Sequence, residues 1–98
     1  MRVQKISREE EAKLPQFGSH EEAKEWFKDR YGADFILTSA EPIGDEMCYF
    51  YYLILDWQSY IKGRKELRIN RNMGAGLDFL LSHQPIQIMQ DGSVHIVH

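Results

Sequence analysis

Residues 47–55 read MCYFYYLIL, and this run of nine apolar or aromatic residues constrains the fold more than any other segment of the 98-residue chain. It falls far short of the roughly 20 apolar residues of a membrane-spanning helix, and its aromatic content favours a β-strand. Successive side chains of a strand point to opposite faces, and a strand with one solvated face alternates apolar and polar residues. Because this run does not alternate, both of its faces need cover.

Two kinds of element could cover the faces of this strand. Helices of the same chain are one source, since amphipathic patterns predict helices at 20–31 and 57–67. A second copy of the chain or a different protein is the other. In a chain this small we do not expect the helices to cover both faces, so we expect a partner on the face that carries Tyr49, Tyr51 and Leu53. Aromatic residues are typical anchors of protein interfaces.

The segments around this run predict one small α+β domain. Ser19 and Glu22 have the spacing of a capping box at the start of helix 20–31. A strand is expected at 34–41, followed by a turn at 42–46. The next segments read as a helix, a basic connector, a short helix and a hairpin, at 57–67, 68–76, 77–83 and 85–98.

The predicted order is therefore α-β-β-α-(α)-β-β, with a mainly antiparallel sheet of about four strands and two or three helices. Residues 19–98 form this single domain. Residues 1–18 are expected to be either a short helix, which a capping box at Ser7 and Glu10 favours, or a flexible N-terminal arm.

The register of the last hairpin can be derived from its hydrophobic pattern. A three-residue loop at 90–92 with Gly92 left-handed pairs Met89 with Ser93 and gathers the apolar side chains on one face. These side chains are Ile86, Ile88, Val94 and Ile96. His95 and His98 then lie on opposite faces, which argues against a metal shared between them.

Charge is distributed unevenly along a chain whose net charge is −3. Residues 33–61 hold five acidic residues and no basic one, whereas residues 62–72 hold five basic residues and one acidic one. Segments of opposite charge in one chain favour association between copies. The alternative is a nucleic-acid binder that uses residues 62–72 with nearby aromatic side chains, although the acidic remainder would repel such a ligand.

No pattern for catalysis, metal or cofactor binding is visible. The single cysteine, Cys48, has apolar neighbours, so we expect a buried and inert thiol. The glycines at Gly74–Gly76 lack the context of a phosphate-binding loop. One cysteine and an N-terminal segment without an apolar core favour the cytoplasm and no membrane association. The size and the lack of motifs are typical of small accessory proteins of bacteria and phages.

The sequence thus predicts a non-enzymatic protein-interaction module that forms a homodimer through the aromatic strand and takes no small-molecule substrate. Replacing Tyr51 by Ala together with Leu53 by Asp is expected to give a folded monomer. The predicted binding residues are Tyr49, Tyr51, Leu53, Arg64, Lys65, Arg68 and Arg71.

Overall fold

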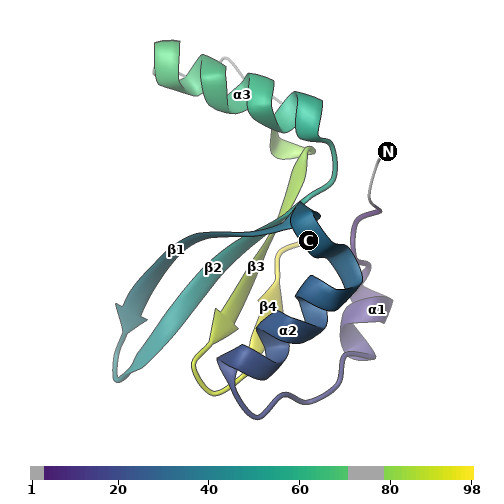
Figure 1. Cartoon of the computed structure of the whole chain (residues 1–98), viewed down its shortest axis with the longest axis vertical. Coiled ribbons are helices and arrows are strands. Elements are labelled where there is room, and N and C mark those ends of the chain that lie inside the picture. Colours follow the sequence, from purple (N-terminus) through teal and green to yellow (C-terminus); the bar gives the residue numbers. More distant parts are fainter. Residues whose placement is uncertain (1–3, 71–78) are drawn as a thin grey trace.

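The computed structural model describes residues 4–70 and 79–98, with the side chains of 66–70 left out. A four-stranded antiparallel sheet in the order β1-β2-β3-β4 is the centre of the molecule (Figure 1). This α+β architecture and its element order confirm the prediction. The elements are α1 (Arg8–Ala12), α2 (His20–Tyr31), β1 (Phe35–Ile43), β2 (Glu46–Ile54), α3 (Trp57–Asn70), β3 (His83–Met89) and β4 (Val94–Ile96), with a 3-10 turn at Gly32–Asp34 after α2.

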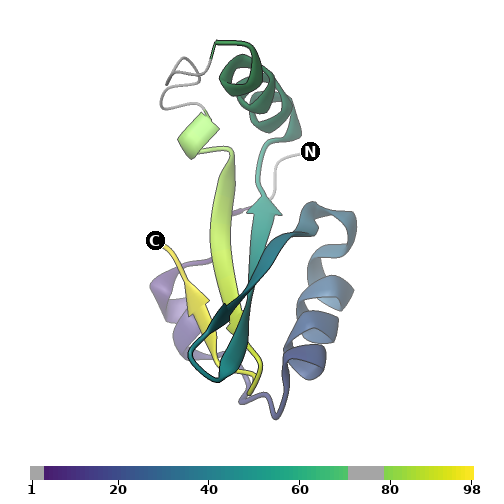
Figure 2. The ribbon, with the colours of Figure 1, turned by 90° about the vertical axis from the view of Figure 1, so that its left-hand side faces the viewer.

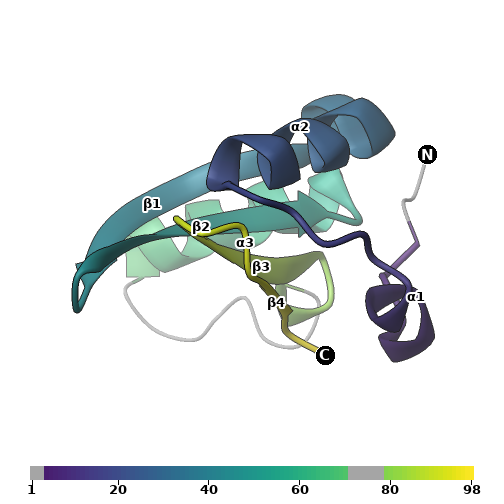
Figure 3. The same cartoon turned by 90° about the horizontal axis from the view of Figure 1, so that it is seen from below.

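Helix α2 lies along one face of the sheet, as Figure 3 shows. It begins and ends where the sequence predicts. The hydroxyl of Ser19 accepts a hydrogen bond from the backbone N–H of Glu22 at 3.2 Å, and Gly32 ends the helix with a φ of 58° that glycine adopts without strain. Ala23 and Phe27 point into the sheet and are fully buried.

The first hairpin is tighter than the sequence suggests. Ile43 pairs with Glu46, so the turn consists of two residues rather than the five expected at 42–46. Gly44 adopts a φ of 63°, which the tight hairpin turn requires. Strand β1 therefore extends to Ile43, past the predicted end at residue 41.

The second hairpin confirms the predicted register. Ile86 pairs with Ile96, and the two neighbouring pairs follow in step. The loop closes through a hydrogen bond from the Gly92 N–H to the Met89 carbonyl at 3.0 Å, with Gly92 in the left-handed region at a φ of 94°. The hydrophobic pattern was thus sufficient to fix this pairing.

The N-terminal segment forms the short helix α1, and both hydrogen bonds of the capping box at Ser7 and Glu10 are present. Ile6 is 3% exposed. The side chain of Gln84 accepts a hydrogen bond from the Ile6 N–H at 2.8 Å and donates one to the Ile6 carbonyl at 3.0 Å. These bonds satisfy a buried amide and anchor the segment to β3.

Helix α1 also closes the β4 edge of the sheet. The Glu11 carboxylate accepts hydrogen bonds from the Ile96 N–H at 3.1 Å and from His98 Nε2 at 2.7 Å. His98 is therefore tied to α1, a contact that register alone did not predict. Edge strands expose unpaired backbone groups, and a covering side chain of this kind blocks further pairing.

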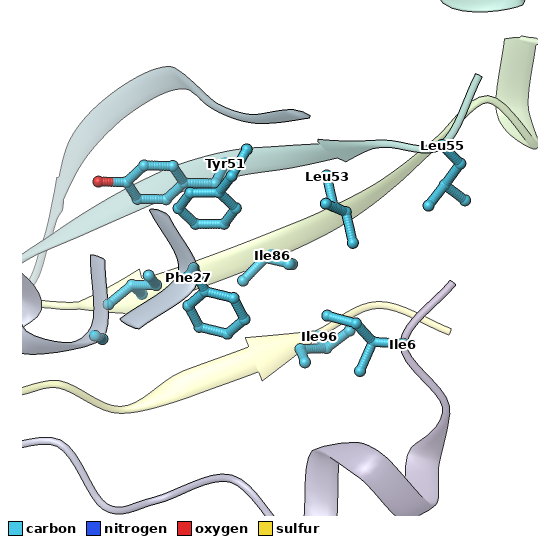
Figure 4. Close-up of a cluster of buried hydrophobic side chains, with 10 residues drawn as sticks. Ile6, Phe27, Tyr51, Leu53, Leu55, Ile86 and Ile96 are labelled. Carbon is cyan, nitrogen blue, oxygen red and sulfur yellow. The ribbon is translucent and has the colours of Figure 1, made fainter. Parts of the chain in front are cut away.

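The core lies between α2, the N-terminal segment and the sheet face that they cover, as Figure 4 shows. The side chains labelled there come from all of these elements. They are Ile6, Phe27, Tyr51, Leu53, Leu55, Ile86 and Ile96.

Candidate interaction surface

The face of β2 that was expected to bind a partner is the inner face of the sheet, the one under α2. Tyr51 is 1% exposed and Leu53 is fully buried, while Tyr49 is half-buried at the edge of the core. The ring of Phe35 stacks on Tyr51 at 4.4 Å and on Phe27 of α2 at 5.0 Å between centroids. Helix α2 therefore occupies the place that the sequence analysis gave to a second copy.

His20, for which the sequence predicted no binding role, ties α2 to this face. His20 Nε2 lies 2.7 Å from the hydroxyl oxygen of Tyr51, and its ring stacks on Tyr49 at 3.6 Å. Burial lowers the pKa of His20 and, with smaller effects from Glu21 and Tyr49, raises the pKa of Tyr51 to about 12. Both partners are thus neutral near pH 7, and the contact is a hydrogen bond within the core.

The opposite face, here called the outer face, is also apolar. Three neighbouring strands supply it, and its half-buried members are Ile36, Phe50, Tyr52, Pro85, Gln87 and Met89. On the same face Cys48 and Ile54 are fully buried, and Ser39, Glu41 and Ile43 are exposed. No helix in the described part of the chain lies along this face, and α3 stands beyond one end of the sheet (Figure 2; Figure 3). The second helix therefore does not cover the outer face as α2 covers the inner one.

Helix α3 joins the sheet through a small aromatic cluster. Tyr52 lies 4.3 Å from His83 and 6.1 Å from Tyr60, measured between ring centroids. Phe79 stacks on Tyr60 at 5.8 Å, and burial lowers the pKa of His83 within this cluster. A Cβ atom at Gly63 would lie 2.3 Å from a Phe79 ring carbon, so the helix approaches Phe79 only because residue 63 has no side chain.

The two ends of the outer face carry opposite charge. Near the β1–β2 turn, Glu41 and Glu46 lie on the outer face together with Ile43 and Cys48. At the other end, Arg64 donates a hydrogen bond to the hydroxyl of Tyr60 at 3.0 Å, and its guanidinium lies 5.8 Å from the ring centroid. Glu41 and Glu46 thus lie at one end of the outer face and Arg64 at the other, while Asp34 and Asp56 lie beside the start of α3, where they accept hydrogen bonds from Trp57 and Ser59.

The remaining predicted basic residues fall in or after α3. Lys65 is exposed on the helix, as is its neighbour Lys62. Arg68 belongs to α3, but its side chain lies outside the described residues, as does the whole of Arg71. Of the predicted electrostatic group, only Arg64 and Lys65 can therefore be placed on the surface.

Cys48 is fully buried on the outer face, which confirms the expected environment of the thiol. Burial, and to a lesser extent the charge of Glu41, raises its pKa. A thiol with a raised pKa is a poor nucleophile.

In residues 4–70 and 79–98, no group of three or more metal-ligating side chains occurs. None of the helices in these ranges is long and apolar enough to cross a membrane. A hollow of about 150 Å³ lies against α1 and α2, with Leu14, Trp26 and Arg30 in its wall. None of its lining residues belongs to the outer face.

Comparison with known proteins adds no assignment to this picture. The chain matches no protein-family model, no curated protein and no solved structure. The fold and the outer face therefore carry the functional argument on their own.

Proposed function

We propose that this chain is a non-enzymatic protein-interaction module that self-associates through the outer face of its sheet. The observation that carries the proposal is the contrast at the centre of β2, where Tyr51 and Leu53 are buried under α2 while Phe50 and Tyr52 on the other side are only half-buried. The aromatic strand stays the interacting element, but the residues that bind are different from those predicted by the sequence.

The physical case is the burial of apolar surface. Removing apolar area from water stabilises an association by about 25 cal/mol per Å², and aromatic side chains near the centre of an interface contribute most. Phe50 is at the centre of the outer face, with Ile36, Tyr52 and Met89 around it. Two such faces can pack on each other as the sheets of a β-sandwich do, about 10 Å apart.

The test is the oligomeric state of the protein and of a Phe50→Glu variant, measured by size-exclusion chromatography with light scattering. We expect a wild-type dimer at micromolar concentration and a folded monomer for the variant, because the new carboxylate would be buried without a partner. Leu37→Glu is the matched control, since Leu37 is 54% exposed and belongs to the inner face. A wild-type protein that is monomeric at high micromolar concentration would refute self-association.

A second candidate function is binding of single-stranded nucleic acid by residues 62–72. Exposed Lys62 and Lys65 favour it, together with Arg64 held against Tyr60 at the basic end of the outer face. Cationic groups beside aromatic rings are the combination that contacts phosphates and stacks on bases. The acidic residues at the other end of the same face limit this candidate to a short contact along α3.

Binding of a labelled oligonucleotide, followed by fluorescence anisotropy at low and moderate salt, tests this second candidate. Its expected signature is affinity that falls steeply with salt, because bound cations displace counterions from the phosphates. Lys62→Glu with Lys65→Glu should abolish the binding without unfolding the protein. Affinity that does not change with salt would count against the candidate.

A further inference from the structure

The outer face of β2 is symmetric in length about one residue. Strand β2 runs from Glu46 to Ile54, and Phe50 stands at its centre with four residues on each side. A strand advances about 3.3 Å per residue, so each end lies about 13 Å from Phe50. The two ends are therefore equally distant from the residue on which the proposed interface is centred.

The outer face carries acidic side chains on one side of Phe50 and Arg64 on the other, with Asp34 and Asp56 beside the start of α3. The acidic side chains of Glu41 and Glu46 stand at the turn end of the face. The basic end is fixed by a chain of contacts in which Tyr60 of α3 packs edge-on against Tyr52, and Arg64 lies over the ring of Tyr60. Figure 1 shows α3 and the β1–β2 turn at opposite ends of the sheet.

This arrangement is complementary to itself. A two-fold axis that passes by Phe50, in the plane of the interface and across β2, brings the turn end of one copy onto the α3 end of the other. Opposite charges then meet at both ends of the interface, and the half-buried apolar side chains meet in the middle. A parallel arrangement of the same faces would instead bring like charges together, which is unfavourable.

We propose that two copies pack outer face to outer face about a two-fold axis at Phe50, so that Arg64 and Lys65 of each copy meet Glu41 and Glu46 of the other. The arrangement rests on the proposed self-association and specifies its geometry. A polyanion is a poorer occupant of the whole face, because its acidic end would repel phosphates.

Two charge-reversed variants test this geometry. The first variant, Glu41→Lys with Glu46→Lys, reverses the acidic residues. The second, Arg64→Glu with Lys65→Glu, reverses the basic residues. In a homodimer of either variant, like charges face each other at both ends. In a heterodimer of the two variants, opposite charges meet at both ends again, although the sign of every contact is exchanged.

We expect each variant alone to dimerise at least roughly tenfold more weakly than the wild type at low salt, since each contact occurs twice in the dimer and changes from attraction to repulsion. An equimolar mixture should form a heterodimer with a Kd within about threefold of the wild-type value. Sedimentation velocity with one labelled variant measures both quantities. Glu9→Lys, an exposed change on α1, is the control and should leave the Kd unchanged.

The outcomes separate this geometry from the proposed function. Variants that dimerise like the wild type, or weakened variants whose mixture stays monomeric, would overturn the arrangement while self-association stands. A monomeric wild type would overturn both. If reversal of Arg64 loosens α3, as circular dichroism would show, Lys62→Glu with Lys65→Glu replaces the variant in which Arg64 and Lys65 are reversed. This replacement leaves the contact between Arg64 and Tyr60 intact.

Discussion

The two faces of β2 are nearly equal in apolar character and differ in what covers them. Tyr51 and Leu53 on the inner face lie under α2 and are buried, whereas Phe50 and Tyr52 on the outer face are only half-buried. Helix α2 reaches its face because the chain crosses directly from it to β1. Helix α3 follows β2 but leaves the sheet at its end, as Figure 2 shows. An apolar pattern therefore shows that a face needs cover, and the path of the chain decides which cover it finds.

The largest loss of stability is expected when a carboxylate is placed on the inner face of β2, and the same charge on the outer face serves as the comparison. Leu53→Asp should unfold the protein or lower its free energy of unfolding by more than about 4 kcal/mol, because it removes a fully buried side chain and leaves a charge without a partner in the core. Urea unfolding followed by circular dichroism measures the loss.

The matched change on the outer face is Phe50→Glu, which should leave the monomer folded. The comparison also reverses the expectation from sequence that a variant with Tyr51→Ala and Leu53→Asp is a folded monomer, since both side chains belong to the core. A cooperatively folded Leu53→Asp protein would mean that α2 does not cover the inner face in solution.

Local features of the fold could be predicted from the sequence because local residues determine them. Ser19 and Gly32 define helix α2, and the alternation of apolar residues fixes the register of the second hairpin. Which face of β2 would meet α2 could not be predicted in this way. The apolar stripe of Ala23 and Phe27 fits either face, and the choice follows from the tertiary path of the chain.

The contacts that cover the inner face are long-range for the same reason. His20 and Tyr51 are 31 residues apart, and Ile6 and Gln84 are 78 residues apart. No periodicity or spacing links such pairs in a single sequence. The sequence shows that acidic and basic residues are segregated along the chain. That Glu41 and Glu46 lie at one end of the outer face and Arg64 at the other depends on where α3 begins.

Gly63 gives the second prediction, because it determines how closely α3 approaches the end of the outer face. In an exposed helix a change from Gly to Ala stabilises by up to about 1 kcal/mol. Here the new methyl group would overlap Phe79, so Gly63→Ala should lower the free energy of unfolding by about 1–3 kcal/mol.

Urea unfolding of Gly63→Ala, with the exposed change Gln58→Ala as control, measures this effect. The double variant with Phe79→Ala should recover part of the loss, since the overlap involves that ring. A more stable Gly63→Ala protein would show that α3 packs less closely on the aromatic cluster than the distances indicate.

The smallest effect compares two histidines, one beside each face. Burial lowers the pKa of His20, the first residue of α2, and of His83 at the α3 end of the outer face, below the ordinary value of 6.5. The unfolded chain then binds protons more readily than the folded chain, so stability is fully present above pH 6.5 and is lost as pH falls toward the lowered values.

Ring-proton chemical shifts followed by NMR as a function of pH measure each pKa. In His20→Gln and His83→Gln, the free energy of unfolding should fall less between pH 7 and pH 5 than in the wild type. If either histidine titrates above 6.5 in the folded protein, its face is more open to water than the structure indicates, and the contrast between the two faces must be redrawn.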